Sequence, residues 1–418
     1  DRHSDVTAPW DTRAPLGTDA YARMRRRAIF ECCKWDPQVE DTATLAPFPL
    51  VLRREVWTEL AMLAEALARE TLDAEAELID RPELHGLLGL PRGCRRALRR
   101  ADAPARDAAR LIRFDFHHTP HGWRISEANT DVPGGLNEAS GVAAIMAEHY
   151  DGLAIAGDVA GTYASALLDR SDTGCVALVH ATAYTDDRQV MSYLARCLEL
   201  LGGTSVLASP MHVTWRARHA TVLTASATDR PDVIARFYPA EWLCDLPIGC
   251  EWEWFFRGCV TPVSNPASAL LTQSKRLPLV WDRLRTPMPT WRALLPETRN
   301  PRDVPKGEGD AWVLKPALGR VGDGVGIRGV TPEREWRRIA RAARWFPGWW
   351  IAQRRFEASP LDTGTELTYP CIGVYTIDGR AAGAYGRIAR SALIDWRARD
   401  IPVLVPVRDE SVATRRSA

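Results

Sequence analysis

The stretch that decides the fold is Arg113-Phe-Asp-Phe-His-His-Thr-Pro-His-Gly-Trp-Arg-Ile-Ser-Glu-Ala-Asn129. Apolar and polar residues alternate on both sides of 119–122, which predicts a β-hairpin that turns there. Side chains two residues apart on a strand point to the same face. We therefore expect Arg113 and Asp115 to share a face, and Glu127 and Asn129 to lie beside them.

Such a hairpin brings two carboxylates, one amide oxygen and one guanidinium together. Carboxylate and amide oxygens are hard ligands that suit Mg²⁺, and an arginine beside them suits phosphate oxygens. A hairpin face held by ordinary salt bridges is the alternative for the same residues. The Thr130–Gly135 turn then leads into a helix expected from Asn137, and a glycine-rich approach to a helix N-terminus favours anion binding.

Outside the hairpin, the pattern is that of a mixed α/β chain. A helical apolar period over 52–78 predicts one long amphipathic helix. A strand at 175–180, a helix over 188–201 and a strand at 204–207 follow β-α-β order, which predicts a small α/β layer domain. Residues 1–48 are expected to be irregular apart from a short helix. Helices are expected near 21–30, 84–98, 104–111, 137–150, 159–168, 271–298 and 332–345, and strands at 220–224, 233–237, 310–330 (interrupted by a glycine loop), 350–356, 372–377 and 381–386.

Composition excludes several classes of protein. With 418 residues, 46% of them hydrophobic and 26% charged, the chain reads as a soluble globular protein rather than a disordered or fibrous one. Its 54 basic and 53 acidic residues give a net charge of +1, so nucleic acid and membrane surfaces are not expected partners. No apolar run reaches the roughly 20 residues of a membrane span. Nine scattered cysteines without a CxxC motif, and a polar start, favour reduced thiols in the cytoplasm.

Lysine is rare in this chain. Only Lys34, Lys275, Lys306 and Lys315 occur, so 50 of the 54 basic residues are arginine (54 − 4 = 50). Arginine and lysine are not interchangeable where a compact point charge is needed. Each lysine therefore indicates a position where an ammonium group could be required.

Two of these lysines stand in segments that suit a nucleotide. Ser274-Lys275 opens an apolar stretch, and the strand 312–316 carries Lys315 into a loop with glycines at 319, 322, 324 and 326. A lysine on a strand can reach the phosphates, while a glycine loop can close its backbone N–H groups over them. The spacing differs from the G-x-G-x-x-G of a dinucleotide site. A plain hairpin loop is the alternative.

In these motifs the chain resembles the glutathionylspermidine synthase family, a chain-permuted branch of the ATP-grasp superfamily. Arg-x-Asp, eleven residues, and Glu-x-Asn before a Pro/Gly turn are similar to that family's metal-binding segment. The resemblance implies two Mg²⁺ ions. Asp115 and Glu127 would bind the first, Glu127 and Asn129 the second, and Arg113 would contact phosphate.

The resemblance continues in the second half of the chain, where Val321 departs from the family's glutamate. It assigns phosphate contacts to Lys275 and Lys315, the nucleotide lid to Arg320, Gly322 and Gly324, the adenine edge to Gln353, and a returning phosphate contact to Arg387. Gln353 could equally be an exposed strand residue. The segment Arg236–Pro239 also resembles a family segment, and its arginine could grip a carboxylate substrate or pack in the core.

The fold implied is α/β (α+β) and ATP-grasp-like. We expect a mainly helical region over 1–110, the metal-binding hairpin and helices over 111–169, a pre-ATP-grasp α/β substrate domain over 170–270, the nucleotide lid and closing sheet over 271–407, and a polar tail over 408–418.

The activity implied is that of an ATP-dependent carboxylate–amine ligase. ATP would phosphorylate a small-molecule carboxylate, and an amine would attack the acyl phosphate, with release of ADP and phosphate. A nucleotide-binding regulatory or scaffold protein that has lost turnover is the alternative, and a kinase-like use of the same site is a third. His117, His118 and His121 suggest zinc only weakly, because no cysteine accompanies them and adjacent strand positions face opposite ways.

Overall fold

The computed structural model describes residues 8–407, apart from residues 37, 40–41, 102–107, 225–226, 306, 320–323, 392 and 395–396. The helices are α1 (Thr18–Cys32), α2 (Arg54–Ile79), α3 (Arg92–Leu98), α4 (Ala143–Ala147, preceded by a π-helical turn over Glu138–Val142), α5 (Val159–Leu168), α6 (Thr185–Leu200), α7 (Ala240–Leu243), α8 (Leu270–Gln273), α9 (Pro289–Leu294) and α10 (Glu333–Trp345). The strands are β1 (Trp10–Thr12), β2 (Gln38–Val39), β3 (Thr42–Ala43), β4 (Leu50–Leu52), β5 (Leu111–Thr119), β6 (Gly122–Asn129), β7 (Leu153–Ile155), β8 (Cys175–His180), β9 (Thr204–Ala208), β10 (Val213–Arg216), β11 (His219–Leu223), β12 (Thr228–Asp229), β13 (Val233–Phe237), β14 (Val263–Ser264), β15 (Thr298–Arg299), β16 (Trp312–Pro316), β17 (Gly326–Ile327), β18 (Trp350–Arg354), β19 (Leu361–Asp362), β20 (Leu367–Ile377), β21 (Arg380–Ala389), β22 (Arg399–Ile401) and β23 (Val403–Pro406).

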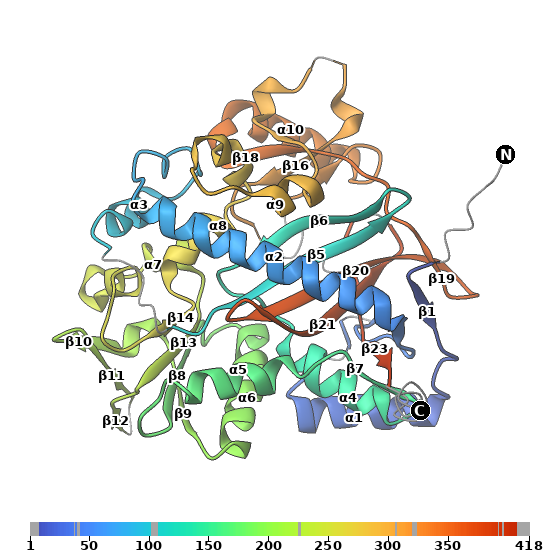
Figure 1. Cartoon of the computed structure of the whole chain (residues 1–418), viewed down its shortest axis with the longest axis horizontal. Helices are drawn as coiled ribbons and strands as arrows, with labels where there is room; N and C mark the ends of the chain where they lie inside the picture. Colours follow the sequence, from blue (N-terminus) through green and yellow to red (C-terminus); the bar gives the residue numbers. More distant parts are fainter. Residues whose placement is uncertain are drawn as a thin grey trace, which may run out of the picture.

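The predicted hairpin forms two of the six strands of the central sheet, which has the strand order β22-β21-β20-β5-β6 with β19 paired to β20. All of these pairs are antiparallel. Helix α2 runs across one face of this sheet (Figure 1). Its buried residues recur every three or four positions, as the apolar period predicted. They include Val56, Leu60, Ala64, Leu67, Ala68 and Leu78.

A second sheet, here called the layer sheet, has the order β14-β13-β8-β9 and is wholly parallel. Strands β8, β9 and β13 and helix α6 lie where the sequence predicted them. The expectation that 220–224 continues this sheet is wrong. Ala217 and Arg218 both have positive φ (49° and 69°), which makes a tight two-residue turn between β10 and β11. Strand β11 therefore belongs to a separate antiparallel sheet, β10-β11-β12.

The lid sheet has the order β15-β18-β16-β17 and is covered by α10 (Figure 1). Its strands and helix confirm the strand–loop–strand–helix–strand pattern expected over 310–356. The prediction of a continuous helix over 271–298 is wrong. Pro278, Pro287 and Pro289 interrupt that segment, and proline cannot continue a helix interior. Only α8, α9 and short 3₁₀ turns form there.

The terminal sheet, β1-β4-β23-β7, joins the two ends of the described chain. Strand β23 pairs in parallel with β4 and antiparallel with β7. The segment expected to be irregular before residue 48 therefore contains paired strands, and α1 is longer than the helix expected at 21–30. These strands are two or three residues long and are stabilised by distant partners, so local pattern does not reveal them.

Two expected helices before the hairpin are shorter or absent. Pro91 stands at the N-cap of α3, so the helix expected over 84–98 covers only its last part, after a run of turns. The helix expected at 104–111 falls partly outside the described residues, and residues 108–110 lack helical structure before β5 begins.

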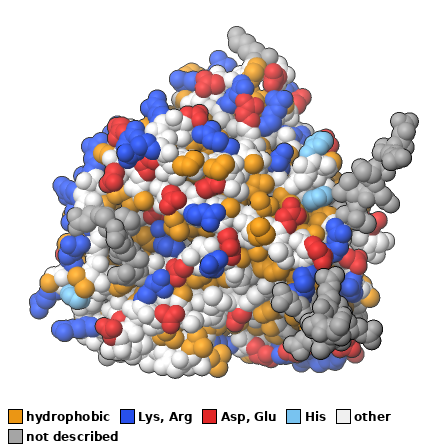
Figure 2. Space-filling view, viewed as in Figure 1, with side chains coloured by type: hydrophobic (Ala, Val, Ile, Leu, Met, Phe, Trp, Pro, Cys, Tyr) orange, Lys and Arg blue, Asp and Glu red, His pale blue; other side chains and the backbone are white. Residues whose placement is uncertain are grey.

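Within the part of the chain that is described, no helix combines the length and apolarity needed to cross a bilayer. Figure 2 shows acidic and basic side chains interspersed over the face that it draws.

Candidate active site

A cavity of about 590 Å³ lies between the central sheet and the lid sheet. The predicted site residues that line it are Arg113, Asp115, Glu127, Asn129, Lys315, Gln353 and Arg387. Lys275 reaches Glu127 from beside the cavity. Arg320 and Gly322 lie outside the described residues, and Gly324 sits where the loop returns, with φ at +69°. The hairpin and the lid strands, far apart in sequence, thus share one cavity.

The hairpin register places the predicted ligands opposite one another. Arg113 pairs with Asn129, and Asp115 pairs with Glu127. A bulge then leaves Ser126 as an extra residue before the pairing resumes at Phe116. Bulges commonly lie beside active sites, where they redirect side chains. Its effect here is to free the Ser126 carbonyl from the ladder, and that oxygen accepts a hydrogen bond from Lys315 Nζ at 3.1 Å.

Arg113 is held in place by partners on three sides. Its Nε and Nη2 atoms donate to both Asp115 oxygens at 2.7 and 3.0 Å, and Nη1 donates to the Gly134 carbonyl at 2.9 Å. The guanidinium also lies 5.3 Å from the centre of the Tyr385 ring. It crosses the next strand at Gly373, where a Cβ would come within 2.6 Å of the arginine side chain. Glycine is therefore required at that position for the arginine to reach the cavity.

Glu127 is the electrostatic centre of the site. Its Oε2 atom lies 2.9 Å from Lys275 Nζ. Burial alone would raise the pKa of Glu127, but Lys275 and Lys315 outweigh burial and lower that pKa to about 2. The carboxylate is therefore ionised throughout the neutral range, as a metal ligand must be.

Lys315 is buried more completely than its role as a cation would suggest. It is 8% exposed, and Nζ donates to Gln353 Oε1 at 2.7 Å. Burial lowers the pKa of Lys315 to about 8, although Glu127 opposes the change. Gln353 is itself 3% exposed and its Nε2 atom donates to Thr298 Oγ1 at 3.3 Å, so the alternative of an exposed strand residue is wrong.

Lys275 also fixes the base of the glycine loop. Its backbone N–H donates to the Ala317 carbonyl at 2.9 Å, and Nζ donates to the Gly319 carbonyl at 3.1 Å. One lysine thus touches the hairpin through Glu127 and the loop through two carbonyls. Any movement of the loop is coupled to the carboxylate through this residue.

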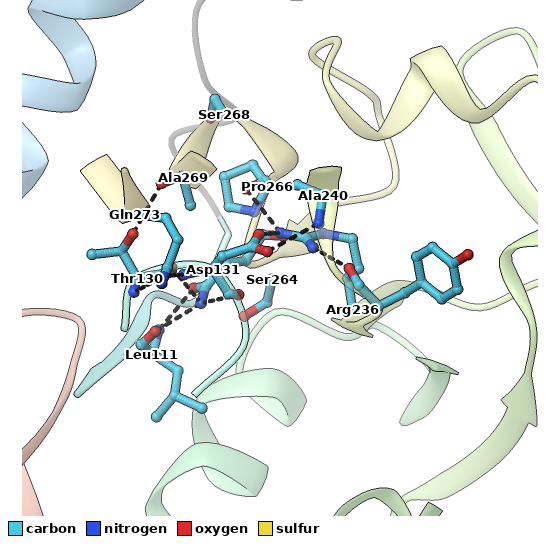
Figure 3. Close-up of polar contacts among 12 residues, drawn as sticks. Leu111, Thr130, Asp131, Arg236, Ala240, Ser264, Pro266, Ser268, Ala269 and Gln273 are labelled. Carbon is cyan, nitrogen blue, oxygen red and sulfur yellow. Dashed lines mark hydrogen bonds and ion pairs between the residues drawn. The ribbon is translucent and has the colours of Figure 1, made fainter. Parts of the chain in front are cut away.

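A buried polar network, which the sequence did not reveal, fixes the turn after the hairpin (Figure 3). Asp131 is 1% exposed and accepts from Arg236 and from the backbone N–H of Ala240. Gln273 Oε1 accepts from the backbone N–H groups of Thr130 and Asp131 at 2.8 and 3.0 Å. Because Gln273 directly precedes Ser274-Lys275, the network positions the lysine segment against the end of the hairpin.

Arg236 belongs to this network rather than to the cavity. It is 3% exposed, and Nε donates to the Asn265 carbonyl at 2.9 Å. Its guanidinium also donates to the backbone carbonyl of Tyr238. It donates as well to the Asp131 carboxylate (Figure 3). Of the two interpretations of this segment, core packing is the one the contacts support.

The histidines of the hairpin have separate protein partners. His117 Nε2 lies 3.0 Å from Ser126 Oγ, and the ring is 5.3 Å from that of Phe356. Burial, with help from Lys315, lowers the pKa of His117 to about 4, which leaves the ring neutral at pH 7. His118 instead lies 3.0 Å from Ser359 Oγ.

The donor set of the hairpin suits magnesium better than a softer ion. Asp115, Glu127 and Asn129 each carry an oxygen that could bind Mg²⁺. In this structure Asn129 Nδ2 donates to Asp115 Oδ2 at 3.2 Å, so the amide nitrogen faces that carboxylate. No cluster of three or more His, Cys, Asp and Glu side chains arranged to hold a metal occurs among the described residues. The cations of Arg113 and Lys275 neutralise the two carboxylates in this arrangement.

The chain matches a known protein family along most of its length. A sequence model described as "Glutathionylspermidine synthase preATP-grasp" matches residues 48–406. The chain belongs to the glutathionylspermidine synthase family. This family match confirms the resemblance drawn from the hairpin and from the Lys315 loop.

One solved structure aligns well enough to support the fold assignment. A glutathione synthetase-like effector of Globodera pallida, in its apo form, aligns with a TM-score of 0.62 over 92% of this chain and 96% of its own, at 10% identity. A protein of Methylobacillus flagellatus described as a gamma-glutamylcysteine synthetase aligns with a TM-score of 0.43 over 78% and 82% of the two chains, at 13% identity. No curated protein matched the sequence. The fold is therefore ATP-grasp-like, as expected for this family.

Proposed function

We propose that this member of the glutathionylspermidine synthase family is an ATP-dependent ligase that joins a small-molecule carboxylate to an amine through an acyl phosphate, with release of ADP and phosphate. One observation carries the proposal. The hairpin carboxylates Asp115 and Glu127 and the lid lysine Lys315 line the same cavity. That combination supplies both metal ligands and phosphate-binding cations within one enclosed space.

In this proposal, one end of the cavity holds the triphosphate. Lys275, Lys315 and Arg387 would contact phosphate oxygens, and Arg113 would do so after loosening its pair with Asp115. Arginine and lysine are the side chains best suited to such contacts. Gln353 would bind the adenine edge, and the loop that carries Arg320, Gly322 and Gly324 would close over the phosphates.

Two Mg²⁺ ions would be held by Asp115 and Glu127, and by Glu127 and Asn129. When bound, such ions would neutralise charge on the phosphates during phosphoryl transfer. The chain's own contribution is to keep Glu127 ionised through Lys275 and Lys315. The register of the hairpin fixes the backbone positions of the ligands, while the Asp115 and Glu127 side chains would have to exchange their pairs with Arg113 and Lys275 for the metal.

The other end of the same cavity is acidic, which supports an amine as the second substrate. Its lining includes Asp36, Glu138, Asp186, Asp187 and Asp400. A cationic amine is attracted to such a region, and an enclosed site strengthens that attraction. The proposal assigns 111–169 and 271–407 to the catalytic core and 170–270 to the substrate domain.

The test is ADP formation from ATP and Mg²⁺ with a panel of carboxylates and amines. We expect ADP release that requires both a carboxylate and an amine, and an amide product detectable by mass spectrometry. ADP release with a carboxylate alone, and a stable phosphorylated product, would favour the kinase-like use of the site. Nucleotide binding without turnover across the panel would favour the regulatory alternative.

A further inference from the structure

Lys34 places a buried ammonium group at the acidic end of the cavity. Its Nζ atom lies 2.7 Å from Glu138 Oε1, 3.1 Å from Asp400 Oδ2 and 3.4 Å from Asp36 Oδ1. The side chain is 8% exposed. An ammonium group has three donors, and here three carboxylates surround it. Lys34 lines the same cavity as Lys315.

The local backbone builds this position. Helix α1 ends at Cys32, and Cys33 takes a left-handed conformation with φ at 55°. The Lys34 N–H then donates back to the Ala28 carbonyl at 2.9 Å, which is a common way to end a helix. The next residue, Trp35, donates its N–H to Gln189 Oε1 at 2.8 Å. The lysine is therefore held between two fixed backbone contacts and directed into the cavity.

The choice of lysine is informative in this chain. Arginine supplies 50 of the 54 basic residues (54 − 4), yet this position keeps an ammonium. The other two lysines that the structure describes, Lys275 and Lys315, are equally buried and lie beside Glu127. Lys34 precedes residues 48–406, so it is not among the positions that define the family match.

Two buried acceptors on adjacent residues of the cavity lining have no hydrogen-bond partner among the described residues, and Asp36 Oδ1 has only its 3.4 Å ion pair with Lys34. Asn137 is 1% exposed, lines the cavity, and its Oδ1 atom has no hydrogen-bond partner among the described residues. Glu138 Oε2 is likewise buried without a partner, while Oε1 of the same carboxylate binds Lys34. A buried polar atom without a partner is costly. These two oxygens are therefore suited to accept N–H groups from a ligand.

We propose that Lys34 determines which amine this site accepts: its ammonium fills the place that a second cationic group of the substrate would take, so the substrate amine carries one amino group and no further cation. This inference rests on the proposed ligase function. Asn137 Oδ1 and Glu138 Oε2 receive the N–H groups of the reacting amine, while one oxygen of each of the three carboxylates faces Lys34 Nζ.

A diamine fits this arrangement poorly for a physical reason. Its second ammonium would have to approach the buried Lys34 ammonium, and like charges repel more strongly at a buried site than in water. A monoamine avoids that repulsion. Removal of Lys34 would leave Glu138, Asp400 and Asp36 without their shared cation, and a second ammonium from the ligand could then replace it.

The experiment measures binding of n-butylamine and 1,4-diaminobutane by calorimetry to the wild type, Lys34→Ala and Lys34→Arg. We expect the wild type and Lys34→Arg to bind the diamine no more tightly than the monoamine. Lys34→Ala should favour the diamine by about ten- to a hundredfold, the range for a hydrogen bond to a charged group. A wild type that already prefers the diamine, or a Lys34→Ala variant without that preference, would overturn the proposal.

If Lys34→Ala does not fold, Lys34→Met combined with Asp36→Asn removes one charge of each sign, keeps Glu138 and Asp400, and is tested in the same way. Thermal unfolding gives a second readout: 1,4-diaminobutane should raise the Tm of either variant more than sodium chloride at equal ionic strength, and an equal effect would contradict the proposal. Binding is measured without turnover. The two tests are therefore independent. A failure to release ADP with any substrate pair would reject the ligase function, whereas the amine-binding measurements alone decide the role of Lys34.

Discussion

Lys275 Nζ lies 2.9 Å from Glu127 Oε2, so the segment that leads to the nucleotide lid is joined to the hairpin by a buried ion pair. The same lysine donates to the carbonyl of Gly319 at the base of the glycine loop. This places one cation between the proposed metal ligands and the proposed lid. A ligand that draws Glu127 toward a metal ion would also release the loop from Lys275.

Replacing Lys315 with methionine should remove most of the affinity for ATP. The variant loses a charged contact to phosphate, which is worth about 1.5–3 kcal/mol, or roughly ten- to a hundredfold in Kd. Its stability should fall by about 1–3 kcal/mol, because Gln353 Oε1 and the Ser126 carbonyl lose their donor. Calorimetric titration with ATP and Mg²⁺ measures the first effect, and thermal unfolding measures the second.

Arg338→Met is the matched control, since Arg338 lies on α10 of the lid with a side chain 73% exposed. This control should bind ATP as the wild type does. Normal ATP binding by Lys315→Met would reject the assignment of the lid strand to the phosphates.

The affinity for ATP should depend on pH through Lys315. Burial lowers the pKa of this lysine to about 8, and only its charged form attracts phosphate. Affinity should therefore fall as pH rises above 8, by up to about tenfold per pH unit. Lys315→Arg should flatten the profile, because arginine stays protonated. A wild-type Kd that is constant from pH 7 to pH 9.5 would contradict this account.

Stability toward acid should depend on Glu127. Burial opposes its ionisation, but Lys275 and Lys315 lower its folded-state pKa from 4.5 to about 2. A carboxyl group with a lowered pKa stabilises the fold above its unfolded value, and that contribution is lost as pH falls from 4.5 toward 2. Glu127→Gln should therefore show a weaker loss of stability over this range. Urea unfolding at pH 5 and pH 3 measures the difference, and equal losses in both proteins would exclude this role.

Arg236→Met should destabilise the fold strongly. The Arg236–Asp131 pair has side chains 0% and 1% exposed, and removal of one partner from such a pair costs about 3–5 kcal/mol. Arg13→Met is the control, because its pair with Asp11 is exposed and is worth less than about 1 kcal/mol. Chemical unfolding compares the two variants. A loss of substrate binding without a loss of stability in Arg236→Met would instead favour a role in holding a carboxylate.

The hairpin and the Lys315 strand were predictable because their signals are local. Alternation of apolar residues sets the faces of a strand, and the turn position alone would pair Asp115 with Ser126. The bulge shifts the register by one residue, and this shift brings Asp115 opposite Glu127 and Arg113 opposite Asn129. The bulge at Ser126 follows from no such pattern, although it brings Lys315 to the hairpin. Its only sequence signal is the odd spacing between the two pairs of ligands.

Residues whose roles depend on distant packing were not predictable. Asp131 is one of many aspartates in loops, and nothing near it indicates that Arg236 will bury it. The segment 220–224 has the composition of a core strand, yet the tight turn before it places it in another sheet. The scarcity of lysine made Lys34 a residue of interest in the sequence. Its partners Glu138 and Asp400 lie far along the chain, so only the structure shows that Lys34 lies in the cavity.

The identity of the released nucleotide is the sharpest test of the proposed chemistry. If Asp115, Glu127 and Asn129 hold metal ions on one side of the β- and γ-phosphates and the lid lysines contact the other, the γ-phosphorus faces the carboxylate. Attack there breaks the bond between the β- and γ-phosphates, so the products are ADP and, after the amine has attacked, inorganic phosphate. Adenylation would require the α-phosphorus to face the substrate and pyrophosphate to leave.

Chromatography of the nucleotides after turnover should therefore show ADP, with no more AMP than a control without enzyme. Glu127→Gln should lower kcat more than it weakens ATP binding, because its carboxylate is assigned to both metal ions and its charge matters most while the γ-phosphoryl group is in transfer. Arg338→Met, on the exposed face of the lid helix, should leave the product and the rate unchanged. AMP as the main product would reject the acyl-phosphate mechanism even though the fold and the family stand, because the phosphates would then lie in the cavity in a different order relative to Lys315 and the hairpin.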